Sequence, residues 1–323
     1  MVPLLWYVPG SMDAALLALR DRLVDQGTAE LSAAPETLQF TGEQTVDALI
    51  NDIQSYPHAF VLAALVDRQV DAKIAWRLPG KVRERVGTFE IDDLAKLDRG
   101  AWIKVLREPT PLHRFIETMA GVLELGVRRI IGQYGGDASA IWSDTPSSKV
   151  VVNRFLEFHG AGPKIATMAA NILVRGFHVP MADYGAIDIS ADVQVCRVMG
   201  RLGFVPEDPG LEEVVRAART LSPDFPGVFD LSLWRIGRTL CRPTNPHCSE
   251  CMVSDLCAYA RRSRGEPMPD AETHAGPAVS LPRPPSTVAA VADALKQLAV
   301  LRDEGLISVE DYDAKKAEWL GRI

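Results

Sequence analysis

The sequence predicts an all-α fold, because apolar residues recur at helical spacing through most of the chain and few stretches alternate as β-strands do. This helical spacing fills seven segments: 12–24, 44–55, 58–77, 112–133, 163–175, 190–203 and 211–221. At 323 residues and 47% hydrophobic, the chain is long enough to bury one large core or two modest ones.

We expect no membrane-spanning helix in this sequence. The longest uncharged apolar run, AFVLAALV at 59–66, is far shorter than the roughly 20 residues that cross a bilayer. The N-terminal stretch MVPLLWYVPGSMDAAL has no basic residue before Arg20, so it lacks the charged start of a secretory signal. We therefore expect a cytoplasmic protein without a membrane partner.

Residues 150–175, VVVNRFLEFHGAGPKIATMAANILVR, predict a tight helical hairpin in the middle of the chain. Gly160 and Gly162 tolerate the positive φ that reverses the chain, and Pro163 suits the first turn of the following helix. A glycine-rich helix start is a natural phosphate seat, although an ordinary helix corner needs no phosphate. Lys164 opposes the helix macrodipole at this position, which suggests a functional role.

Four of the five cysteines fall in CRPTNPHCSECMVSDLC at 241–257, with the spacing C-x6-C-x2-C-x5-C. A reducing cytosol disfavours structural disulfides, so metal binding is the leading interpretation of these four. Zinc is a weaker alternative, because zinc fingers generally use two close cysteine pairs and this run has one. Cys196 lies among apolar residues and is expected to be a small buried hydrophobe.

The formal net charge of −7 argues at first against a nucleic-acid partner. The charge is unevenly distributed, however, because residues 1–66 carry 2 basic and 8 acidic side chains and residues 266–323 carry 6 and 10. Residues 67–265 have 27 basic against 24 acidic side chains, so a local basic face is expected only there.

The C-terminal part predicts a linker and a small attachment module. Residues 266–286 contain six prolines and read as an extended linker. Residues 287–323 show two short amphipathic helices around DEGLIS, a pair too small to be stable alone. Through LAVLRDEGLISVEDYDAKKAEWL this segment resembles SHOCT modules, a resemblance that implies self-association or protein docking.

The central region resembles a known family. The hairpin FHGAGPKIA, the later ADVQVCRV, Gly237-Arg238 leading into Cys241, and the cysteine spacing are together similar to the endonuclease III-like DNA glycosylases of the helix-hairpin-helix (HhH-GPD) superfamily. The resemblance implies a two-lobed helical fold that binds double-stranded DNA between its lobes. It divides the chain into an N-terminal extension partly packed on the cluster lobe, a glycosylase domain, the linker and the tail: 1–57, 58–265, 266–286 and 287–323.

The same resemblance implies a [4Fe-4S] cluster and a set of site residues. The cluster ligands would be Cys241, Cys248, Cys251 and Cys257. Lys164 matches the nucleophile that forms a Schiff base, and Asp192 matches the carboxylate that stabilises positive charge on the sugar, with Asp188 as the runner-up. Gln69 matches the residue that fills the gap left by the extruded base. Further DNA contacts are expected at the hairpin and the cysteine loop: His159, Gly160, Gly162 and Arg242.

The chain departs from the family pattern at two places. Phe158-His159 stands where the family hairpin has Leu-Pro, and His159 could contact DNA or have no chemical role. Lys164 and Asp192 are 28 residues apart, more than the resemblance leads us to expect. The extra residues lie within RGFHVPMADYGAIDIS at 175–190; they could reshape the base pocket or lengthen a surface loop, and they bring in Asp183 and Asp188 as competing carboxylates.

The predicted function is base excision by a DNA glycosylase with abasic-site lyase activity. A monofunctional glycosylase in which Asp192 activates water is one alternative, and a non-catalytic DNA-binding or assembly protein is another. The identity of the base is left open among oxidised, alkylated, mispaired and hypermodified bases.

Overall fold

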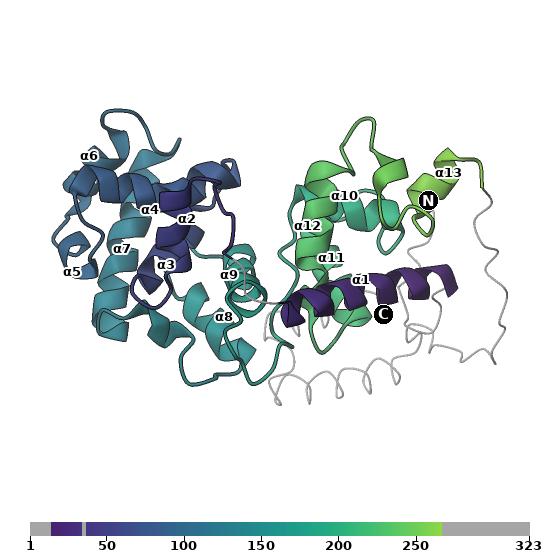
Figure 1. The fold of residues 1–323 in the computed structure, drawn as a ribbon, viewed down its shortest axis with the longest axis horizontal. Coiled ribbons are helices and arrows are strands. Elements are labelled where there is room, and N and C mark those ends of the chain that lie inside the picture. The colour runs from purple at the N-terminus through teal and green to yellow at the C-terminus, as the bar shows by residue number, and fades with distance from the viewer. Residues whose placement is uncertain (1–13, 34–36, 267–323) are drawn as a thin grey trace, which may run out of the picture. The chain divides into compact units, whose positions relative to one another are not determined.

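The computed structural model describes residues 14–33 and 37–266. Every regular element in these two ranges is helical, and they contain no β-strand, so the prediction of an all-α fold is confirmed (Figure 1). The chain divides into two compact units, 1–270 and 271–323, and all described residues belong to the first. The predicted tail 287–323 and all of the linker after Glu266 lie outside the described residues.

The first lobe is formed around one central helix. Its elements are α2 (Gln44–Asn51), α3 (Pro57–Val66), α4 (Ala72–Val86), α5 (Ile91–Leu94), α6 (Arg99–Arg107), α7 (Ile116–Tyr134), η2 (Ala138–Ile141), α8 (Ser148–Leu156) and α9 (Pro163–Arg175). All ten residues of α3 are buried, and α2, α4, α7, α9 and η2 pack around it (Figure 1). A helix that is apolar on every side is stable only in such a central position.

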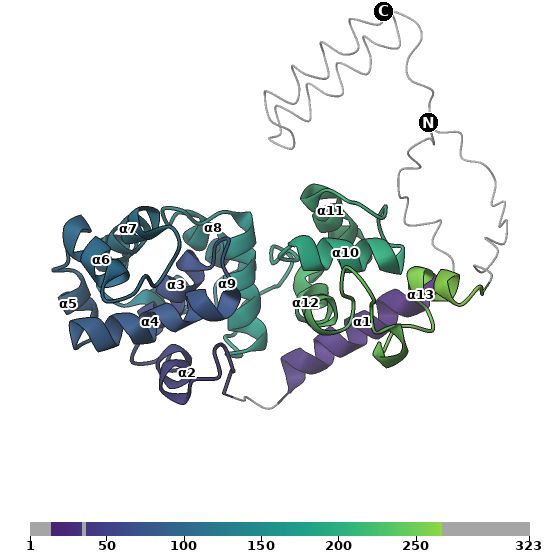
Figure 2. The same ribbon diagram turned by 90° about the horizontal axis from the view of Figure 1, so that it is seen from above.

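The second lobe combines the first described helix with the last ones. Its elements are α1 (Ala14–Ser32), α10 (Val193–Leu202), α11 (Leu211–Leu221), η3 (Pro226–Phe229), α12 (Asp230–Thr239), η4 (Cys248–Glu250) and α13 (Ala258–Ser263). Figure 2 shows α1 beside α12, whereas α2 packs on α3 and α4 of the first lobe. A Cβ on Gly27 would lie 2.1 Å from the Val228 carbonyl oxygen, so the close contact of α1 with η3 requires glycine there.

The apolar segment 58–77 does not form one continuous helix. The helix α3 ends at Val66, and α4 begins at Ala72 after Asp71 caps it by accepting a hydrogen bond from the Lys73 backbone N–H. The mainly polar stretch from Asp67 to Asp71 interrupts the helix and forms a loop. Gln69 lies in this loop, three residues after the end of α3.

Residues 176–191 connect the two lobes. Ile187 and Ile189 are buried, while Ala182, Asp183 and Gly185 are exposed in the middle of the segment. The Asn171 side-chain amide donates to the Asp188 carbonyl at 2.9 Å, which fastens the end of the segment to α9. The extra residues are thus more than a lengthened surface loop, since they carry part of the packing between the lobes.

Among the described helices, none is both long enough and apolar enough to cross a membrane.

Candidate active site and cysteine cavity

The turn between α8 and α9 depends on its glycines. Gly160 has φ of +86°, and a Cβ there would lie 2.9 Å from both Arg68 Nη1 and Val122 Cγ2. A side chain at residue 160 would therefore be strained by the backbone and crowded by its neighbours. Gly162 is the N-cap of α9 and has no side chain with which to satisfy the helix start. The backbone N–H groups at this helix start are free of a side-chain cap, as a phosphate seat needs.

The departure at Phe158-His159 is accommodated without loss of packing. Phe158 is 2% exposed, its ring stacks with Tyr134 at 6.2 Å between centroids, and the Arg129 guanidinium lies 5.5 Å from the ring centroid. His159 is exposed at the turn. Phe158 therefore anchors the hairpin from inside, and His159 is available to a ligand on the outer side.

Lys164 lies at the second position of α9 and faces a carboxylate that the sequence analysis did not single out. The Lys164 side chain is 41% exposed, and its Nζ is 3.8 Å from Oδ2 of Asp67. The Asp67 side chain is only 10% exposed, at the point where α3 ends. The lysine predicted from the hairpin is thus half open to solvent and paired with a buried acid.

Several groups act on the protonation of Asp67. Burial raises the pKa of the Asp67 carboxyl above its ordinary value, while Lys164 and a hydrogen bond with Trp76 act to lower it. The charges of Asp192 and Asp71 act to raise this pKa further, so Asp192 lies within electrostatic range of Asp67. Lys164 and Asp67 therefore form an ion pair, and the charge of Asp192 is a smaller influence on the pKa of Asp67.

Asp192 is held at the start of α10. Its Oδ1 accepts hydrogen bonds from the backbone N–H groups of Gln194 at 2.8 Å and Val195 at 2.9 Å, which makes it the N-cap. An N-cap aspartate is fixed in position and benefits from the positive end of the helix dipole.

The two competing aspartates have other partners. Asp188 accepts two hydrogen bonds from Arg219, from Nε and Nη2, each at 2.7 Å. Asp183 accepts a hydrogen bond from the Ser148 hydroxyl. Of the three carboxylates in this part of the chain, Asp192 is the one whose charge reaches the Lys164–Asp67 pair.

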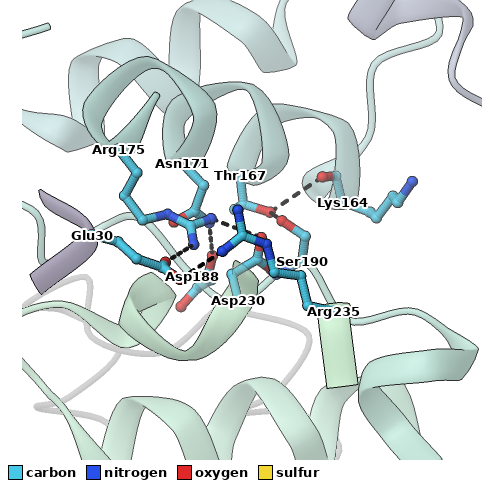
Figure 3. Close-up of polar contacts among 9 residues, drawn as sticks. All are labelled: Glu30, Lys164, Thr167, Asn171, Arg175, Asp188, Ser190, Asp230 and Arg235. Atoms are coloured by element: carbon cyan, nitrogen blue, oxygen red, sulfur yellow. Dashed lines mark hydrogen bonds and ion pairs between the residues drawn. The ribbon is translucent and has the colours of Figure 1, made fainter. Parts of the chain in front are cut away.

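A buried ionic network ties the Lys164 helix to the Asp192 segment (Figure 3). Arg175, in the last turn of α9, pairs with Asp230 of α12 at 3.2 Å and with Glu30 of α1 at 3.4 Å. Asp230 also accepts a hydrogen bond from the Ser190 backbone N–H at 2.6 Å, two residues before Asp192. Burial raises the pKa of both Asp230 and Glu30. The network fixes the relative positions of the elements that carry the candidate catalytic residues.

Gln69 is exposed in the loop between α3 and α4 and has φ of +52°. A positive φ is uncommon for a residue with a side chain and is worth about 1 kcal/mol or more of strain. The loop is fastened to the second lobe because Arg238 Nη2 lies 3.5 Å from Asp71 Oδ2. Since Asp67 lies two residues before Gln69, this loop brings Gln69 close to Lys164.

The four cysteines of 241–257 line one small cavity with Leu240, Ile236 and Tyr259. The pKa of the Cys251 thiol is raised by burial and by the neighbouring Cys241 and Cys248. Thiolates so close together are stable only around positive charge. In the described residues no three metal-binding side chains converge on a point that one ion could occupy. The four thiols that line this cavity are a donor set that fits a four-thiolate iron–sulfur cluster.

Arg201 secures the cysteine loop and was not predicted from the sequence. Its guanidinium donates to the Arg242 carbonyl at 2.6 Å, to the Pro243 carbonyl at 2.8 Å and to Cys241 Sγ at 3.3 Å. The guanidinium carbon also lies 4.6 Å from the Tyr259 ring centroid. The Arg242 side chain is exposed, so it is free to contact a ligand while its backbone is fixed. Cys196 is buried in α10, as expected.

The described chain has the helix-hairpin-helix fold of the endonuclease III-like DNA glycosylases. It superposes on a thermostable thymine-DNA glycosylase with a TM-score of 0.53 and 17% identity, covering 77% of this chain and 99% of that one. It superposes equally on Endonuclease III from a non-covalent DNA complex, with a TM-score of 0.53 and 17% identity over 79% of this chain and 100% of that one. The predicted two-lobed fold is thereby confirmed.

Sequence comparison also finds similarity to endonuclease III and to an endonuclease III-like protein. Endonuclease III of Thermotoga maritima is 32% identical over 141 residues, which is 43% of this chain and 56% of that protein. Endonuclease III-like protein 1 of Gallus gallus is 30% identical over 132 residues, 40% of each chain. The chain thus spans about half the length of these curated relatives. No family model matches the chain.

Proposed function

We propose that the protein is a DNA N-glycosylase that flips a damaged, mispaired or modified base out of the duplex and cleaves its N-glycosidic bond. The observation that supports this best is the ion pair of Lys164 with the buried Asp67, with Lys164 directly after the glycine turn. The sequence similarity to Endonuclease III supports it independently. An abasic-site lyase step through a Schiff base of Lys164 is the second part of the proposal.

The two sequence-predicted catalytic residues have different tasks. Cleavage of a glycosidic bond develops positive charge on the sugar, and Asp192, fixed at the start of α10, stabilises that charge. Lys164 attacks the anomeric carbon as a neutral amine. Its partial exposure leaves the Nζ accessible to a sugar bound over the hairpin.

Other predicted residues hold the DNA. The uncapped start of α9 at Gly162 receives a phosphate, with Gly160 allowing the turn and His159 on its outer side. Gln69 enters the space left by the flipped base, and Arg242 contacts a phosphate from the cysteine loop. Flipping costs a few kcal/mol, less for a damaged or mispaired base, and so contributes to selectivity.

Cys241, Cys248, Cys251 and Cys257 would hold a [4Fe-4S] cluster, which supplies a rigid cross-link between its ligands and takes no part in the glycosylase chemistry. Arg201 orients the loop that carries the first of these ligands. Arg238, at the end of α12, pairs with Asp71 of the first lobe. The cluster and the loop around it would keep Arg238 in place for this contact.

Borohydride trapping tests the proposal. The wild-type protein is incubated with duplexes that carry an abasic site or one of a panel of modified bases, and covalent adducts are counted after reduction. We expect an adduct that is lost in Lys164→Ala and retained in Lys149→Ala, which removes an exposed lysine of α8. Absence of a wild-type adduct on every duplex would refute the lyase step.

A monofunctional glycosylase is a second candidate, because Lys164 Nζ already has the Asp67 carboxylate as a partner at 3.8 Å. In that case Asp192 activates water, and strand cleavage appears only after alkali. Asp192→Asn distinguishes both candidates from a DNA-binding protein without catalytic activity, because it abolishes base excision in an enzyme. A wild-type protein that is inactive on the whole panel is not a glycosylase.

For residues 287–323 we propose self-association or protein docking, on the sequence pattern alone. Sedimentation of the full chain and of a Trp319→Asp variant tests this. The proposal would be contradicted if the full chain and the variant sediment equally at all concentrations and no added partner protein changes the sedimentation of either.

A further inference from the structure

A buried acid outside the predicted catalytic set faces the predicted nucleophile. Asp67 Oδ2 lies 3.8 Å from Lys164 Nζ, and no other carboxylate among the described residues forms an ion pair with Lys164. Asp192 instead caps α10, where its Oδ1 accepts the two N–H groups that begin the helix. The nearest proton acceptor for the Lys164 ammonium is thus Asp67.

We propose that Asp67 is the group that accepts the proton of Lys164 and so releases the neutral amine that attacks the sugar. This inference rests on the proposed lyase function and assigns its proton transfer. Asp192 then serves only to stabilise the sugar cation. Two carboxylates in different surroundings with separate duties are a common arrangement in enzymes that combine acid–base and electrostatic catalysis.

The surroundings of Asp67 suit a proton acceptor. A fully solvated aspartate is too weak a base to compete for a lysine proton, because their ordinary pKa values are about 3.9 and 10.4. The Asp67 side chain is 10% exposed, and burial raises its pKa, as do the charges of Asp192 and Asp71. A base bound over the half-exposed Lys164 would exclude water from the pair and favour the neutral acid and amine further.

The proton inventory closes within the pair and the substrate. An N–H bond of the Lys164 ammonium breaks and an O–H bond forms on Asp67. At an abasic site the amine lone pair then forms the bond to the C1′ aldehyde carbon, the C=O π bond breaks, and the oxygen takes a proton from the nitrogen. The proton on Asp67 passes to this hydroxyl, which leaves as water while the C=N bond forms, so the Asp67 carboxylate is restored.

The pH dependence of adduct formation distinguishes this role from a structural one. Transfer inside the pair needs no hydroxide, so a wild-type enzyme with Asp67 as acceptor forms adduct at a rate that changes little with pH above the pKa of that acid and falls below it, where Asp67 is already protonated. In Asp67→Asn the lysine must lose its proton to solvent, and the rate rises about tenfold per pH unit. General base catalysis typically contributes about 10²–10⁴-fold, so we expect about a 10⁴-fold loss near pH 6 that shrinks to about tenfold near pH 9.

The experiment measures single-turnover borohydride trapping of the full-length protein on an abasic duplex between about pH 5.5 and 9.5. Asp67→Glu keeps a carboxylate and is expected to restore part of the low-pH rate. Glu84→Gln removes a charge from the exposed pair with Lys81, outside the site, and it should keep the wild-type profile. Thermal unfolding and binding to a duplex with a stable abasic analogue establish that each variant is folded.

Each outcome decides the matter. A loss in Asp67→Asn that is equal at all pH values assigns a structural role and overturns the proposal. A gain near neutral pH also overturns it, since Asp67 would then only hold Lys164 protonated. If the wild type forms no adduct, the lyase function itself fails and this role with it, whereas a wild-type adduct with an unchanged Asp67→Asn profile refutes the role of Asp67 alone.

Discussion

Removal of the Asp230 carboxylate is expected to destabilise the protein by an amount that can be worked out from the buried network. The Arg175 side chain is 5% exposed and depends on Asp230 and Glu30 for compensation. Breaking a buried ion pair on one side typically costs about 3–5 kcal/mol. The Ser190 N–H also loses an acceptor at 2.6 Å, a loss of about 1–3 kcal/mol if nothing replaces it.

The two contributions are not additive, because Arg175 keeps Glu30 at 3.4 Å. We therefore expect Asp230→Ala to lower the free energy of unfolding by about 3–4 kcal/mol, which corresponds to a fall in Tm of roughly 10 °C for a unit of this size. Asp230→Asn keeps an acceptor for Ser190 and should cost less than Asp230→Ala. Adduct formation should also slow, because Ser190 lies two residues before Asp192.

Thermal and urea unfolding followed by far-UV circular dichroism measure the stability change, and borohydride trapping measures the activity. Arg235→Ala is the matched control: Arg235 pairs with the same Glu30 at 3.2 Å, but its side chain is 59% exposed. An exposed pair of this kind contributes about 1 kcal/mol or less. If Asp230→Ala and Arg235→Ala destabilise equally, the network does not carry the stability inferred from its burial.

Three further predictions concern single residues. Burial lowers the pKa of His58, whose Nε2 bonds to the Phe89 carbonyl at 2.7 Å, so the stability that the neutral imidazole contributes is present above about pH 6.5 and lost as pH falls. His58→Gln should therefore reduce the loss of stability between about pH 7 and 5 by up to about 1.4 kcal/mol per pH unit. Urea unfolding at each pH measures this change. Arg201→Lys should speed the loss of the visible iron–sulfur absorption band under a chelator, because lysine cannot reach both loop carbonyls and Cys241 Sγ at once. Gln69→Gly should relieve about 1 kcal/mol of backbone strain and raise Tm while weakening binding to a duplex with an abasic analogue, measured by fluorescence anisotropy.

Controls and contrary results differ among the three. His159→Gln changes an exposed imidazole and should leave the pH profile of stability unaltered; a profile unaltered in His58→Gln contradicts the first prediction. Arg262→Lys alters an exposed pair with Glu207 and should not affect the chelator rate. Binding that is unchanged in Gln69→Gly would show that the side chain does not enter the DNA.

The sequence predicts local features of this molecule well. The turn at Gly160 and the placement of Lys164 follow from residues that are neighbours in the chain, and so does the cysteine spacing. Helical periodicity likewise predicts the fold class. The break between α3 and α4 was missed, because the apolar pattern continues through and beyond the mainly polar stretch from Asp67 to Asp71 that separates the two helices.

Long-range partners could not be predicted. Arg175 meets residues that are 55 and 145 positions away in the chain, and no local pattern marks Asp230 or Glu30 as its partners. Asp67 looks like an ordinary helix-terminal acid until the fold brings α9 against the end of α3. The choice between Asp188 and Asp192 also needs the structure, since only the position of Arg219 shows that Asp188 is already paired.

The packing of α1 has a consequence for the order of events during synthesis. Its Arg22 bonds to the Met252 carbonyl and to Asp255, and its Gly27 contacts Val228, so its partners emerge from the ribosome more than 200 residues later. At typical synthesis rates of 5–20 residues per second, this delay is roughly 10–40 s. During that time the first lobe can form while the apolar face of α1 stays exposed. Completion of the second lobe is the step that ends this exposure.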